Sequence, residues 1–340
     1  MTVNIGLVTS DALVLGCDSV ASSSEYLLDP FSLIWEQGPD GKPLEGPDGK
    51  WSVRFAREDF RQIVTNAWGG VTKMFEIHPS PSPVVAVTAG LAKLNERPIA
   101  SLANEFFAGV RDRKRKLVRI EVICDQFLQF MRKKYIEHYR DSKLDEQFRD
   151  GPEFLIGGFG RDDAFPSIHR LSVQANTVKA EFAGGNSGVA WNGQSDAVER
   201  FIRGYDGNLK HHIDRRVLAA VKGHSTKMQQ YVTGLVNQIL DSLQEELPPG
   251  IAIELPEVDN LGLNWEQFFV PIDYANIPLQ EAVSFVAALV MTQASKSRFA
   301  RGVATVGGRT HIGVVTKQRG FEILNEPALT HRYTGFGDDV

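Results

Sequence analysis

The sequence has few cysteines, no long apolar run and no signal-like start, and each absence argues against a class of protein. Its two cysteines, Cys17 and Cys124, lie far apart and outside any CxxC or Cys/His spacing. They predict neither a disulfide framework nor a zinc site. The longest apolar stretches, such as 286–291, are too short to span a bilayer. These features predict a cytoplasmic protein without a membrane partner.

A strong excess of positive charge is also missing. The formal net charge of −5 argues against a nucleic-acid partner, which requires a surplus of Lys and Arg to neutralise phosphates. The one basic run, at 111–119, lies between two helical patterns, and we interpret it as a solvated helix–helix corner.

Common catalytic motifs are absent as well. The chain has no HExxH, no phosphate-binding P-loop and no GxSxG. GGFG at 157–160 is too short for a dinucleotide fingerprint, and His211-His212 has no matching carboxylates at metal-ligand spacing. We therefore expect neither a cofactor nor a metal.

Apolar patterning predicts an α+β protein with antiparallel sheets, because its strands are grouped apart from its helices. The expected strands cover 3–8, 12–17, 71–77, 84–90, 153–160, 165–173, 178–184, 308–316 and 321–324. The expected helices lie near 99–110, 120–131, 213–246 and 279–297.

Two segments interrupt this pattern. Residues 22–70 contain GPDGK twice, and each Asp-Gly is a turn signal. Residues 248–278 contain five prolines and no clear period. We expect one domain over 1–340 with insertions at these two places.

The second residue is a candidate nucleophile. Removal of Met1 would give Thr2 a free α-amine beside its hydroxyl. An α-amine has a reference pKa of about 7.7–8.0, so it can act as the base for its own hydroxyl near neutral pH. Thr also follows Met in many unrelated sequences, so this position alone decides nothing.

Residues further along add a resemblance. Gly6 follows Thr2 by four positions, and Asp18 follows it by sixteen. Lys73 precedes an apolar pair, Gly90 closes a strand before a helix, and double-glycine strands occur at 154–172 and 306–324. This order resembles the β-type subunits of the proteasome and their bacterial relatives, which are N-terminal-nucleophile (Ntn) hydrolases. The likeness covers about 1–21, 71–205 and 279–325.

The resemblance implies a four-layer αββα sandwich and a set of catalytic residues. Thr2 would supply the attacking Oγ, Lys73 a positive charge beside it, Asp18 the partner of Lys73, and Gly90 an N–H for the oxyanion. Three of these residues also have a purely structural interpretation: Asp18 as a turn residue at a strand end, Lys73 as a surface charge and Gly90 as a helix-entry glycine. By the same resemblance, the substrate pocket would be small and apolar and would be lined by Ala21, Ser22, Val71, Phe75, Thr88 and Ala92. Phe75 fits an ordinary core position equally well.

Two turns depart from that family. Asn192-Gly193-Gln194-Ser195 replaces a Gly-Ser-Gly turn, and the Asp expected before Gly307 is missing, with Thr305 nearby. The function that the resemblance implies is a threonine-type hydrolase that cleaves peptide or amide bonds as a homo-oligomeric ring, with an ATP-driven unfoldase as a candidate partner. The alternatives are an inactive structural subunit and a small-molecule amidase on the same fold.

Overall fold

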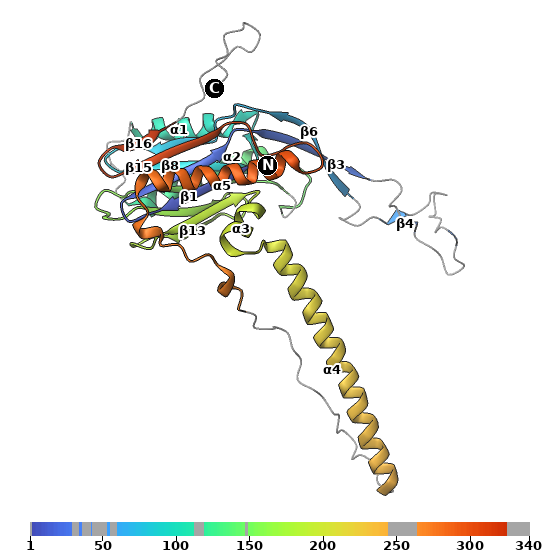
Figure 1. The fold of residues 1–340 in the computed structure, drawn as a ribbon. Helices are drawn as coiled ribbons and strands as arrows, with labels where there is room; N and C mark the ends of the chain where they lie inside the picture. Colours follow the sequence, from blue (N-terminus) through green and yellow to red (C-terminus); the bar gives the residue numbers. More distant parts are fainter. Residues whose placement is uncertain are drawn as a thin grey trace. The chain divides into compact units, whose positions relative to one another are not determined.

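The computed structural model describes residues 2–28, 34–35, 42, 53–54, 60–111, 119–146, 149–243 and 264–324. In this part the protein is mixed α/β, with antiparallel sheets and five α-helices (Figure 1). Contacts divide the chain into two compact units, Met1–Ser195 with Asp273–Val340, and Asp196–Ile272. The expectation of one domain over 1–340 stays a prediction. No helix among the described residues has the length and apolar character needed to cross a membrane.

The first sheet contains the N-terminal strands in its centre. Its order is β14 (Gly188–Gly193), β1 (Val3–Val8), β2 (Ala12–Asp18), β15 (Thr310–Thr316) and β16 (Gly320–Ile323), all antiparallel. Every residue of β1 and β2 is buried, which explains why both are nearly continuous apolar runs. Helix α5 (Leu279–Phe299) packs on this sheet through β1, β2 and β15.

The second sheet has the order β13 (Thr177–Phe182), β12 (Ser167–Ser172), β11 (Pro152–Gly158), β8 (Val84–Gly90) and β7 (Met74–His78). Helix α1 (Ile99–Arg111) packs on β7, and α2 (Ile120–His138) packs on β11, β12 and β13. Their amphipathic spacing was the basis for predicting both helices, and the structure confirms them. Phe106 and Phe154 each meet Phe127 edge to face, with ring centroids 5.1 Å apart.

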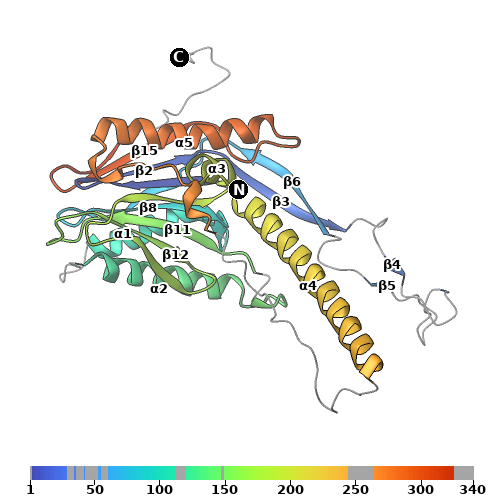
Figure 2. The same ribbon diagram turned by 60° about the horizontal axis from the view of Figure 1, so that its bottom comes forward.

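The two sheets also contact each other. Strand β1 touches β8, β11 and β12 of the second sheet. A buried cluster fills the space where they meet, including Leu13, Leu15, Val85, Val87, Leu155 and Ile168. Figure 2 shows α5 beside β2 and β15, and α1 and α2 beside β8, β11 and β12. This packing brings the end of β2 next to the start of β7, where the candidate site lies.

Smaller strand pairs account for the rest of the first unit. Strand β3 (Ala21–Leu28) pairs with β6 (Phe60–Trp68), β4 (Ile34–Trp35) with β5 (Val53–Arg54), and β9 (Lys93–Leu94) with β10 (Arg97–Pro98). Except for Lys42, the two GPDGK turns lie outside the described residues, as does the basic run at 112–118.

The second unit contains α3 (Asp196–Arg203), α4 (Gly207–Leu243) and a 3-10 turn at Glu266–Phe268. The aromatic ring of Tyr205 meets that of Trp265, whose indole N–H donates to Asp214 on α4. Four apolar side chains of the stripe that predicts this long helix are solvent-exposed: Met228, Tyr231, Leu235 and Ile239 are between 41% and 65% exposed.

Candidate active site

A buried ion pair joins the two sheets. Asp18 is the last residue of β2, and Lys73 immediately precedes β7. The Lys73 ammonium lies 2.7 Å from Asp18 Oδ1, and the two side chains are only 4% and 1% exposed. The two residues are 55 positions apart, so only the packing of the two sheets brings them together.

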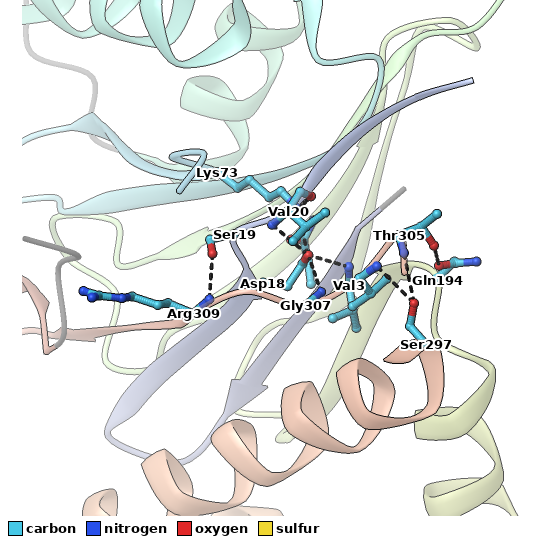
Figure 3. Close-up of polar contacts among 12 residues, drawn as sticks. Val3, Asp18, Ser19, Val20, Lys73, Gln194, Ser297, Thr305, Gly307 and Arg309 are labelled. Carbon is cyan, nitrogen blue, oxygen red and sulfur yellow. Dashed lines mark hydrogen bonds and ion pairs between the residues drawn. The ribbon is translucent and has the colours of Figure 1, made fainter. Parts of the chain in front are cut away.

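The carboxylate of Asp18 also organises three backbone segments (Figure 3). Oδ1 accepts a hydrogen bond from the N–H of Val3, and Oδ2 accepts from the N–H groups of Val20 and Gly307, each at 3.1 Å. The Lys73 ammonium donates in addition to the carbonyl of Val20. Asp18 therefore fixes the start of β1 and the turn before β15 relative to Lys73.

Burial has a direct effect on Lys73. Loss of hydration lowers the pKa of its ammonium, and the neighbouring carboxylate of Asp18 opposes this shift. A charged lysine at this place attracts negative charge nearby more strongly than it would in water, because little solvent screens it.

Thr2 immediately precedes β1 and is buried, with 6% of its surface exposed. Its carbonyl accepts a hydrogen bond from the N–H of Gln194 at 2.6 Å. Gly193 has φ +80, and a Cβ at that position would lie 2.1 Å from the carbonyl oxygen of Thr2. Only glycine therefore allows the end of β14 to approach Thr2 this closely.

A small cleft, here called the Thr2 cleft, gathers most of the predicted site residues. It has a volume of about 50 Å³. Its lining includes Thr2, Ala21, Ser22, Val71, Lys73, Thr88, Gly90 and Ala92. Gly90 has φ +78, and a Cβ there would lie 2.4 Å from the carbonyl oxygen of Gly151. Thr88 Oγ1 is buried and has no hydrogen-bond partner among the described residues.

Phe75 lies elsewhere. It belongs to the aromatic core beneath α1 and α2, where its ring packs against Phe154 at 6.3 Å, and it is not part of the lining of the Thr2 cleft. Phe75 lies within β7 and Lys73 precedes the strand, so the period-two alternation of a strand does not require the two side chains to share a face.

Sequence reasoning missed part of the support around Thr2. Thr305 Oγ1 donates to Gln194 Oε1 at 2.8 Å, and Ser297 Oγ accepts from the N–H groups of Thr305 and Val306 at 3.1 and 3.2 Å. The sequence indicates Gln194, Ser195 or Thr305 as sources of part of the hydrogen bonding that the missing Asp would supply, although none of them is a carboxylate, and no pattern signals Ser297. Within the described ranges, no group of three or more His, Cys, Asp or Glu side chains could hold a metal ion.

The fold and this site define a mixed α/β protein with two antiparallel sheets and a buried Asp–Lys pair beside Thr2. Among solved structures, the chain is similar to Anbu (ancestral beta-subunit) from Yersinia bercovieri, with 11% identity, a TM-score of 0.44, and coverage of 96% of this chain and 88% of that one. An Anbu (Gly-1) mutant from Hyphomicrobium sp. strain MC1 gives 11% identity and a TM-score of 0.44, with coverage of 96% of this chain and 85% of that one. Anbu from Pseudomonas aeruginosa, described as a helical assembly, gives 13% identity and a TM-score of 0.43, with coverage of 92% of this chain and 81% of that one.

These comparisons correct the family suggested by the sequence. No family model and no curated protein matches the chain. The three structures are Anbu proteins rather than proteasome β-subunits, and their identity of 11–13% is low. The assignment to the bacterial proteasome-type threonine peptidases is therefore wrong, and any function must be argued from the site itself.

Proposed function

We propose that the protein is an amide-bond hydrolase that uses Thr2 as its nucleophile after removal of Met1. The observation that carries this proposal is the buried Asp18–Lys73 ion pair in contact with the cleft that Thr2 lines. A buried ion pair costs desolvation and is weak evidence for stability alone. Its position beside a hydroxyl and an open cleft supports a chemical role.

The reaction would take place in two steps. The α-amine of Thr2 accepts the hydroxyl proton while Oγ1 attacks the carbonyl carbon of the amide. The C–N bond then breaks, the amine half leaves with that proton, and the acyl group stays on Thr2 as an ester. Water, deprotonated by the same amine, hydrolyses the ester and restores the hydroxyl.

Lys73 and Gly90 would assist these steps. The Lys73 ammonium stabilises negative charge that develops on Oγ1, and Asp18 holds that ammonium in place. The N–H of Gly90, in the wall of the same cleft, would donate to the oxyanion. Both groups are held in advance by the sheets, so neither must reorganise during the reaction.

The Thr2 cleft indicates a small acyl group. With a volume of about 50 Å³, the cleft has room for only a few groups the size of a water molecule. Small side chains line it, and Thr88 Oγ1, which has no partner in the described part of the chain, offers a hydrogen bond to the substrate. The cleft size favours short peptides and small amides over substrates with a bulky side chain before the cleaved bond.

The wider organisation is part of this proposal. The contacts of α5 with the first sheet and of α1 and α2 with the second fit a four-layer αββα order in a single domain with two insertions. Self-association is also proposed, because the exposed apolar stripe on α4 is typical of a surface that another chain covers.

Replacing Thr2 tests the function. Thr2→Ala should lower hydrolysis of a panel of short peptide amides by at least about 1,000-fold, because no other hydroxyl has the amine as its base. Thr2→Ser should keep partial activity. Thr72 also lines the cleft but lacks the amine, so Thr72→Ala is the matched control and should stay active. Undiminished turnover in Thr2→Ala would overturn the mechanism, and no turnover in the parent protein would favour an inactive subunit.

A further inference from the structure

A second and larger cleft lies at the end of helix α5, and we call it the α5 cleft. Its volume is about 490 Å³, which is within the range of small-molecule sites. Its walls come from β6, the last turn of α5 and the loop that follows. The lining residues that matter here are Gln194, Lys296, Ser297, Arg301, Val303 and Thr305.

Among the described lining residues of the α5 cleft, the charged side chains are Lys296 and Arg301, and both are positive. Within the part of the chain that the structure describes, Arg301 forms no ion pair. The C-terminal end of α5 contributes partial negative charge, equivalent to about half an elementary charge, and the full positive charge of Arg301 alone outweighs it.

Amide and hydroxyl groups complete the polar wall. Thr305 Oγ1 donates to Gln194 Oε1, and the backbone of Thr305 is held by Ser297. Figure 3 shows Gln194, Thr305 and Ser297 together beside Val3 and Gly307. Because these bonds fix the wall in advance, a ligand meets groups that are already ordered.

The α5 cleft is connected to the nucleophile through one residue. Gln194 lines the cleft, and its backbone N–H donates to the carbonyl of Thr2 at 2.6 Å. The α5 cleft and the Thr2 cleft share no lining residue among those that the structure describes. Thr2 therefore lines a small cleft whose one charged wall residue, Lys73, is paired with Asp18, and its carbonyl is bonded to a residue of the larger cleft that contains Arg301.

We propose that the α5 cleft binds a carboxylate on the amine half of the substrate, the half that leaves when Thr2 is acylated. The inference rests on the proposed function, because it assigns the acyl half to the Thr2 cleft. Arg301 would pair with the carboxylate, Lys296 would add positive charge to the same wall, and the side chains of Gln194 and Thr305 would hydrogen-bond other polar groups of the ligand. The substrates would then be short peptides or amides with a free α-carboxylate or an acidic side chain after the cleaved bond.

Direct binding tests the cleft independently of turnover. The protein is the Thr2→Ala variant, and the probes are dansyl-glutamate and its neutral diamide, followed by fluorescence anisotropy. We expect dansyl-glutamate to bind at least tenfold more tightly, and this difference to shrink with added salt because both cations are exposed. The two single amides of dansyl-glutamate show whether the α-carboxylate or the side-chain carboxylate is the group bound.

Three substitutions locate the binding. Arg301→Gln should weaken dansyl-glutamate binding about fivefold, or about 1 kcal/mol, which is the upper range for an exposed charge pair. Arg298→Gln removes another arginine from the same helix end, outside the lining, and should change binding less than twofold. Val303→Trp fills the cleft from an exposed wall position and should abolish binding. Equal binding of the diamide, or no effect of Arg301→Gln and Val303→Trp, would overturn the proposal.

Turnover separates this inference from the function on which it rests. In the parent protein, acetyl-alanyl-glutamate should have a higher kcat/KM than its diamide, and Arg301→Gln should reduce that preference. Carboxylate binding without any such preference overturns the assignment to the leaving half. Hydrolysis that survives Thr2→Ala overturns the proposed function but leaves the binding result standing.

Discussion

Replacing Lys73 by methionine would leave the carboxylate of Asp18 buried without its counter-charge. The pair is 2.7 Å apart, and both side chains are at least 96% buried, so water cannot replace the ammonium. Breaking a buried pair costs about 3–5 kcal/mol of unfolding free energy. The three backbone N–H groups that donate to Asp18 remain, and we therefore expect the lower end of that range.

The reverse change, Asp18→Asn, would remove the negative charge but introduce an amide. One amide N–H₂ group would then face backbone N–H groups that now donate to an oxygen, and each unsatisfied donor costs about 1–3 kcal/mol. The double variant Asp18→Asn with Lys73→Met removes both charges, so only this hydrogen-bond loss persists. We expect an interaction energy of roughly 2–3 kcal/mol between the two positions.

Urea unfolding followed by circular dichroism measures all four proteins of this cycle. Arg97 and Glu105 provide the matched control, because they form an ion pair at 2.5 Å with side chains 42% and 40% exposed. The same cycle with Arg97→Met and Glu105→Gln should give less than about 1 kcal/mol. An interaction energy for Asp18 and Lys73 no larger than that of the exposed pair would refute the reasoning.

Three further predictions follow from the same geometry. Gly193→Ala should displace Thr2 and reduce activity at least tenfold, whereas Gly184→Ala, also at positive φ but with open space around its Cβ, should leave activity nearly unchanged; equal effects of the two would contradict this. The rate should rise with pH as the Thr2 amine loses its proton, near its reference pKa of about 7.7–8.0, and fall at alkaline pH when Lys73 deprotonates. Because burial lowers the pKa of Lys73, that fall should come at lower pH than the titration of a free lysine, and a rate that stays constant through this range would argue against a charged Lys73. Sedimentation at micromolar concentration should show an oligomer that Tyr231→Glu on α4 weakens, and a monomer would contradict self-association.

Elements with a clear apolar period could be predicted from the sequence. Strands β1 and β2 were visible as buried runs, and α1, α2 and α5 as amphipathic stripes. Strand β14 was not predicted, because its sequence GVAWNG ends in Asn-Gly, a turn signal. It is a strand because it pairs with β1 along its whole length, which is a tertiary effect. Helix α3, with eight residues, is too short to show a period.

In the candidate site too, contacts between residues distant in the sequence could not be predicted from local patterns. Asp18 and Lys73 were paired only through a resemblance, and the structure places them in contact even though the family assignment behind that resemblance is wrong. The bond from Gly307 to Asp18 joins residues 289 positions apart, and no local pattern encodes it. No local pattern encodes the position of Phe75 either, because its burial against Phe154 depends on how the second sheet packs on its helices.

The central claim is that Thr2, freed of Met1, is the nucleophile. Peptide mapping by mass spectrometry after treatment with an electrophilic β-lactone tests it most directly. We expect the N-terminal peptide to begin at Thr2 and to carry one acyl group, and the Thr2→Ala variant to carry none. A protein that hydrolyses amides while it retains Met1, or that is acylated at another residue, would contradict the claim.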